Sequence, residues 1–167
     1  MKFLVAVALA LLMLTLESVL VQRMGLAISR IDVTVVLIAF LALRATTLEG
    51  AVTSYSVGYL LDLMSGQPTG LYTFLGVFVF LIARLILNFV DVRTAASFVL
   101  FAVGADALHG LLAAVFTWLT AKDGSSSAML SAMPLQLLLT GLAAFLLFPL
   151  LRRIEAKSER PASGLLR

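Results

Sequence analysis

The chain has 167 residues, of which 62% are hydrophobic and only 13% are charged, and its formal net charge is +3. Soluble globular domains carry about 25% charged residues, so this composition excludes an ordinary soluble domain and predicts a polytopic integral membrane protein. There is no cysteine and one histidine, which excludes disulfides, thiolate metal sites and multi-histidine metal sites. The basic residues gather at the ends of apolar segments, which indicates membrane orientation rather than nucleic-acid binding.

Four apolar runs are long enough, or nearly so, to cross a bilayer, for which about 20 residues are needed. The first run is too long for the apolar core of a signal peptide, so we expect it to remain as a membrane helix. Pro134 stands at the start of the last run, where the first turn of a helix tolerates proline. The linker between the second and third runs, with Asp91 and Arg93, is predicted to be a solvated turn. The runs cover residues 3–22, 71–90, 95–119 and 134–151.

Residues 31–64 are harder to assign, because Arg44, Glu49 and Gly50 interrupt the apolar pattern. We split this stretch into two helices at 31–43 and 48–64, the first of which is too short to span unaided. The prediction is therefore an all-α bundle of six transmembrane helices, and one span over 31–64 leaves five as the alternative.

Residues 1–151 are predicted to form one transmembrane domain, and residues 152–167 a short charged tail in the cytoplasm. With six spans and the N-terminus inside, eight Lys and Arg residues are cytoplasmic and three are outside, as the positive-inside rule requires. Five spans with the N-terminus outside give the same bias, so the side of the N-terminus stays open. Both arrangements place the 65–70 and 122–128 loops outside and the tail inside the cell. The eight residues of the first arrangement are Lys2, Arg44, Arg93, Arg152, Arg153, Lys157, Arg160 and Arg167.

Several ionisable residues fall within the predicted spans, where each costs about 2.5–3.5 kcal/mol to insert and therefore needs a partner. Arg84 and Asn88 are four residues apart on one face of the fourth predicted helix, and Asp106 and His109 share a face of the fifth. The two helices are antiparallel neighbours, and Arg84 and Asp106 lie at nearly the same depth. We therefore expect an Arg84–Asp106 ion pair between them.

Glu17 in the first predicted helix lies at a depth at which it can meet His109. Three roles remain open for this polar core: locking the bundle, receiving a polar group of a partner helix, and handling a proton or substrate. Small residues in the fifth helix permit close helix approach, which predicts that this helix is central. They are Ala102, Gly104, Ala105, Ala107 and Gly110.

Motifs of the common enzyme classes are missing from the sequence. There is no H-E-x-x-H, no G-x-S-x-G and no P-loop, and the aspartates are scattered rather than clustered for metal-dependent lipid chemistry. We expect no enzyme activity, no metal and no cofactor.

The most informative stretch runs from residue 58 to residue 72, where an apolar helix ends, a turn with glycine and proline reverses the chain, and another apolar helix begins. Glycines in the turn allow backbone angles that other residues resist, and Asp62 is placed to accept hydrogen bonds from loop amides or to cap the next helix. This stretch resembles the G-x-x-x-D-L-x-S-G-x-x-x-G-like signature of the rod shape-determining MreD family. The resemblance rests on Gly58, Asp62, Leu63, Ser65, Gly66 and Gly70, and the motif loop also contains Pro68.

Membership of that family would imply a non-catalytic component of the bacterial cell-elongation complex in the cytoplasmic (inner) membrane. Such a protein would bind the single-pass protein MreC, would act indirectly with the actin-like MreB and cell-wall synthases, and would help organise side-wall peptidoglycan synthesis. The resemblance also implies a fold similar to the substrate-binding components of energy-coupling-factor vitamin transporters. That transporter role is the alternative function, with Glu17, Asp62 and His109 as polar ligand contacts.

Overall fold

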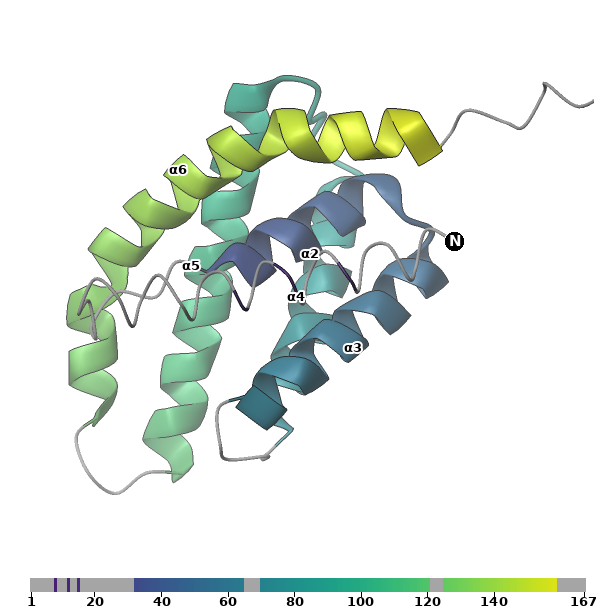
Figure 1. The fold of residues 1–167 in the computed structure, drawn as a ribbon. Helices are drawn as coiled ribbons and strands as arrows, with labels where there is room; N and C mark the ends of the chain where they lie inside the picture. Colours follow the sequence, from purple (N-terminus) through teal and green to yellow (C-terminus); the bar gives the residue numbers. More distant parts are fainter. Residues whose placement is uncertain are drawn as a thin grey trace, which may run out of the picture.

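The computed structural model describes residues 32–64, 70–120 and 125–158, together with Ala8, Leu12 and Thr15, and the side chains within 32–64, 70–119 and 133–153. Apart from connecting turns, the continuous ranges are helical (Figure 1). The helices are α2 (Val33–Arg44), α3 (Thr47–Met64), α4 (Leu71–Ile86), α5 (Ala95–Thr120) and α6 (Ser125–Ser158). The predicted helix at 3–22 lies outside the described ranges, apart from three isolated positions.

The split of residues 31–64 into two helices is confirmed. Helix α2 has 12 residues and ends at Arg44, and α3 begins three residues later at Thr47. At 1.5 Å per residue α2 is only about 18 Å long, which is too short to cross a membrane alone. A single continuous helix over this stretch is wrong.

Among the described residues, two helices are long and apolar enough to cross a membrane, within α5 (Ala95–Leu119) and within α6 (Met133–Arg153). The predicted limits of α5 are confirmed, whereas α6 extends beyond its predicted limits at both ends. Pro134 lies inside α6 rather than at its start, and Pro149 is a second interior proline. Because an interior proline removes a backbone hydrogen bond and kinks a helix, these residues account for the curved course of α6 in Figure 1.

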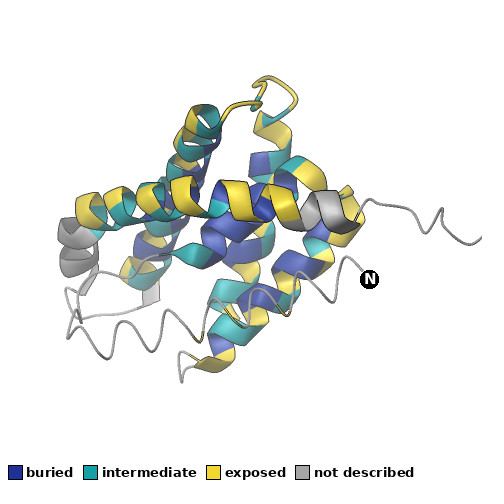
Figure 2. Cartoon of the chain, turned by 45° about the horizontal axis from the view of Figure 1, so that its top comes forward, coloured by how far each residue is buried: buried dark blue, intermediate teal, exposed yellow. Residues whose placement is uncertain are grey.

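Helix α2 lies at the centre of the bundle, because α3, α4, α5 and α6 all pack against it. Most of its residues are buried, as the dark blue helix in the middle of Figure 2 shows. Aromatic rings continue this core: Phe40 meets Phe98 edge-on at 6.2 Å, and Phe98 stacks on Phe148 at 5.0 Å between ring centroids. Because α2 is buried against neighbours on all sides, the short second helix is the core element.

The prediction that α5 is the central helix is therefore only partly right. Ala102 and Ala105 are buried, but Gly104 is exposed, and a methyl group added to Gly104 would meet no atom within 4 Å. Small residues occur on the outer side of α5 as well as on its packed side. Their presence in the sequence therefore does not show which helix is central.

Candidate functional site

Both ends of α2 are capped by ionisable side chains. Asp32 is the N-cap, and its Oδ1 accepts a hydrogen bond from the backbone N–H of Val35 at 3.2 Å. At the other end, Nη1 of Arg84 in α4 donates to the carbonyl oxygens of Ala42 at 2.7 Å and Ala45 at 2.9 Å. Helix ends leave backbone groups without partners, and at membrane depth such groups must be satisfied within the protein. An acidic N-cap and a basic group at the C-terminus also complement the helix dipole.

The predicted Arg84–Asp106 ion pair is wrong. Arg84 bonds to the carbonyls of α2, and the described partner of Asp106 is Gln136, whose Nε2 donates to Oδ1 at 2.9 Å. The reason is the length of α4, which ends at Ile86 instead of residue 90. Arg84 consequently lies in the last turn of α4, closer to the C-terminus of α2 than to the middle of α5.

The prediction that Asn88 shares a helical face with Arg84 is also wrong, because Asn88 follows the end of α4 in a turn. There it lines a cleft of about 530 Å³ together with Arg84 and Arg93. Arg93 pairs with Asp91 at 2.7 Å, and both side chains are more than half exposed. The predicted solvated turn at this position is confirmed.

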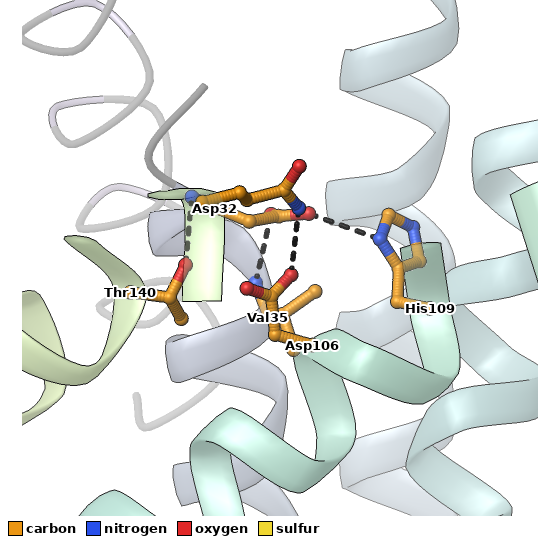
Figure 3. Close-up of polar contacts among 6 residues, drawn as sticks. Asp32, Val35, Asp106, His109 and Thr140 are labelled. Atoms are coloured by element: carbon orange, nitrogen blue, oxygen red, sulfur yellow. Dashed lines mark hydrogen bonds and ion pairs between the residues drawn. The ribbon is translucent and has the colours of Figure 1, made fainter. Parts of the chain in front are cut away.

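A second polar group lies near the middle of α5, where Asp106 and His109 face the start of α2 and the middle of α6 (Figure 3). Nδ1 of His109 contacts Oδ2 of Asp32 at 2.9 Å. The hydroxyl oxygen of Thr140 accepts a hydrogen bond from the backbone N–H of Asp32 at 3.4 Å. We call Asp32, Asp106, His109, Gln136 and Thr140 the polar cluster. It joins α2, α5 and α6 inside the bundle.

Three members of the polar cluster are buried, and the other two, Asp32 and Gln136, are partly exposed. The exposed fractions are 1% for Asp106, 7% for His109 and 0% for Thr140. Both polar residues predicted for α5 are therefore at the site, but with partners that the sequence did not indicate. The predicted contact of Glu17 with His109 lies outside the described residues.

The helical hairpin of α3 and α4 holds the described part of the sequence signature. Asp62, which is 2% exposed, lies near the end of α3 and caps α4. The Oδ1 atom of Asp62 accepts a hydrogen bond from the backbone N–H of Tyr72 at 3.1 Å. Its Oδ2 atom accepts two hydrogen bonds from Thr73, one from the backbone N–H at 2.8 Å and one from the side-chain hydroxyl at 2.5 Å. The predicted capping role of Asp62 is confirmed.

Glycines let the two helices of the hairpin approach closely. A methyl group added to Gly58 would lie 2.5 Å from the carbonyl oxygen of Tyr72 and 2.7 Å from Cα of Thr73. One added to Gly50 would overlap the ring of Phe80. Gly70, before α4, has φ +72°, a conformation that glycine adopts at no steric cost. The signature residues Ser65, Gly66 and Pro68 are outside the described ranges.

The hairpin also contacts the polar cluster. The ring centroids of Tyr72, in the first turn of α4, and His109 lie 6.4 Å apart. Helix α2 begins beside His109 and ends beside Arg84. Helix α4 also begins near His109, at Tyr72, and has Arg84 in its last turn. The two helices therefore run in the same direction. This direction is what the six-span prediction requires of its second and fourth helices.

Sequence reasoning missed Asp32, Gln136 and Thr140. Asp32 had a usable signal, because an aspartate directly before an apolar run is a common helix start. Gln136 and Thr140 had none, since single polar residues in a long apolar helix do not reveal which neighbour they face.

No protein-family model, curated protein or solved structure matches the chain. The residues themselves therefore carry the functional argument. They offer capped helix ends, a tightly packed hairpin and one largely buried group of two carboxylates and an imidazole.

Proposed function

We propose that this protein is a multi-pass, non-catalytic component of the bacterial cell-elongation complex in the cytoplasmic membrane, with an MreD-like role. Membrane insertion is supported by α5 and α6, which are long and apolar enough to span a bilayer. The outer faces of the bundle are exposed (Figure 2), and many of the residues there have large apolar side chains, which also supports membrane insertion. They include Leu100, Trp118, Leu138 and Leu146, each more than 60% exposed. Lipid is the environment in which such a surface is stable.

The single observation that carries the MreD-like role is the α3–α4 hairpin. Three signature positions have separate physical tasks there: Gly58 allows close backbone approach, Asp62 caps α4, and Gly70 supplies the left-handed turn. A signature with these tasks maintains the shape of a hairpin and requires no chemistry. This fits a protein that acts by presenting a rigid surface to others.

The surface that we assign to the partner lies on this hairpin. The rings of Tyr55 and Tyr59 stack along α3, and those of Phe74 and Phe78 stack along α4. Three of these residues are about half exposed, and Phe78 is 36% exposed. A shallow groove of about 510 Å³ runs between the two helices and is lined by three of these rings. Aromatic residues are enriched at the centres of protein interfaces. We assign this groove to the transmembrane helix of an MreC-like single-pass partner.

The alternative is a substrate-binding component of an energy-coupling-factor transporter. The observation in its favour is the largely buried polar cluster, since a small polar ligand needs buried polar contacts. Of the ligand contacts expected for this role, Asp62 is occupied in capping α4 and His109 faces Asp32.

The test is affinity purification of the tagged full chain in mild detergent, with mass spectrometry of the proteins that accompany it. We expect a single-pass coiled-coil protein and cell-wall synthases. An ATPase pair with a transmembrane coupling subunit would instead establish the transporter role, and recovery of neither set would refute both.

A matched pair of variants locates the partner surface in the same experiment. The double variant Tyr59→Ala, Phe74→Ala removes two rings of the groove and should reduce recovery of the partner at least about tenfold, as expected for the loss of interface hot spots. Leu138→Ala on α6, where the side chain is 73% exposed, should leave recovery unchanged. Equal recovery with both variants would refute the assignment of the groove.

A further inference from the structure

The polar cluster contains a set of side chains that the elongation role does not use. Asp32, Asp106 and His109 each offer one ligand atom, and these three atoms lie within 4.8 Å of one another. They come from separate places in the chain: Asp32 precedes α2, and the other two occupy one face of α5, three residues apart. Figure 3 shows the three side chains gathered around one point.

Asp106 provides an independent reason to expect a ligand. Its Oδ1 accepts a hydrogen bond from Gln136, but its buried Oδ2 accepts none within the part of the chain that the structure describes. A buried oxygen without a partner costs about 1–3 kcal/mol, and more when the group is charged. Native proteins leave few such atoms, and those that remain often face a bound water or ion.

Within the described residues, the polar neighbours of Asp106 include the neutral side chains of Gln136 and Thr140 and the imidazole of His109. Its hydrogen-bonding partner is the neutral amide of Gln136, and Nδ1 of His109 is directed to Asp32. Arg84, the arginine that the sequence pairs with Asp106, is held at the opposite end of α2 by carbonyl oxygens. Two carboxylates with a neutral imidazole and one divalent cation carry no net charge, which suits an apolar interior.

The donor atoms indicate the kind of cation. Magnesium and calcium prefer oxygen ligands only, whereas zinc binds imidazole nitrogen at about 2.0–2.1 Å and carboxylate oxygen at about 2.0–2.2 Å. Three ligands around a tetrahedral zinc lie about 3.4 Å from each other, so side-chain rotations suffice to close the observed spacing. Gln136 donates a hydrogen bond to the carboxylate of Asp106, and Thr140 accepts one from the backbone N–H of Asp32. Both side chains would therefore orient metal ligands without binding the metal themselves.

We propose that Asp32, Asp106 and His109 form an intramembrane binding site for a divalent transition-metal cation, with zinc as the best fit. One histidine excludes a multi-histidine site but not this combination of one nitrogen and two oxygen ligands. The site fixes the start of α2 to the middle of α5, so binding should tighten the core of the bundle. This proposal does not depend on the role in cell elongation.

The experiment uses the purified full chain in detergent, stripped with a chelator and then titrated with zinc. We expect about one zinc per chain by elemental analysis and a rise in thermal unfolding temperature. Cobalt in place of zinc should give the visible absorption of a tetrahedral site. Wild-type protein that binds neither metal above the background of empty detergent would overturn the proposal without any variant.

Three variants assign the ligands. Asp106→Asn and His109→Gln should each weaken zinc binding at least about tenfold, as removal of even supporting groups does in known metal sites. Asp91→Asn changes an exposed carboxylate and should bind as the wild type does. Zinc binding that survives both cluster substitutions, or that is lost with Asp91→Asn, would place the metal elsewhere and refute the site. If one cluster variant fails to fold, the other carries the comparison.

Discussion

Gly58→Ala tests the closest backbone contact of the hairpin. The added methyl group would lie 2.7 Å from Cα of Thr73, whereas carbon atoms pack at about 3.5–4.0 Å. The atoms that it meets belong to the backbone rather than to a flexible side chain, so α3 and α4 must move apart by roughly 1 Å. The hydrogen bonds from the backbone of Tyr72 and Thr73 to Asp62, now 3.1 and 2.8 Å, would then stretch.

The expected cost follows from these two effects. Overpacking costs about 1–3 kcal/mol, and loss of the two hydrogen bonds costs about 1 kcal/mol each. Alanine regains about 1 kcal/mol through its higher helix propensity. Gly58→Ala should therefore lower the free energy of unfolding by about 2–4 kcal/mol.

The control is Gly104→Ala on α5, because a methyl group there meets no atom within 4 Å. This variant should keep only the helix-propensity gain and be neutral or up to about 1 kcal/mol more stable. Unfolding in mixed micelles of increasing SDS content, followed by helical circular dichroism, measures both. If Gly58→Ala unfolds at the same SDS fraction as Gly104→Ala, the close approach of the two helices is wrong.

Further substitutions test the caps and the orientation. In the same unfolding assay, Asp62→Ala should lower the free energy of unfolding by about 1–3 kcal/mol, because two backbone N–H groups of α4 lose their acceptor. Asp62→Asn keeps one oxygen and should lower it by less. Equal losses of stability in the two variants would contradict the capping role of Asp62. Arg84→Ala should lower the free energy of unfolding by about 1.5–3 kcal/mol. The control Arg93→Ala, which removes an exposed ion pair, should lower it by less than about 1 kcal/mol. Similar losses of stability in the two variants would show that the α2 carbonyls do not need Arg84. The exchange Arg84→Asp with Asp106→Arg should not restore stability, and rescue would reinstate the ion pair that the sequence suggests. A topology reporter fused after Arg153 should read cytoplasmic, and a periplasmic reading would overturn the proposed orientation.

The helices were predictable where a single local rule decides them. The apolar run at 95–119 matches α5 to within one residue, and the break near Arg44 and Glu49 separates α2 from α3. Asp62 could be assigned as a cap, because an acidic residue ahead of a glycine-containing turn has few other tasks. In each case the information lies within about ten residues of the element concerned.

Partners between distant helices were not predictable, because they depend on where each helix ends. A fourth helix that runs to residue 90 has Arg84 about half a turn nearer its centre, at the depth of Asp106, whereas α4 ends at Ile86. Equal depth on neighbouring helices also does not establish contact, because rotation about each helix axis decides which side chains meet. The link from Asp32 to His109 spans more than 70 residues, and no local pattern records it.

The short α2 explains why ionisable residues occur in so apolar a bundle. A spanning helix ends in the interfacial region, where water satisfies its terminal N–H and C=O groups, but the 12-residue α2 is packed against four other helices and begins beside the buried His109. Asp32 and Arg84 supply the missing partners at its two ends. Asp106 is different, because it caps no helix and retains a buried oxygen without a partner in the described structure. Structural need therefore accounts for two of these three charges, and the third is the one that requires a ligand.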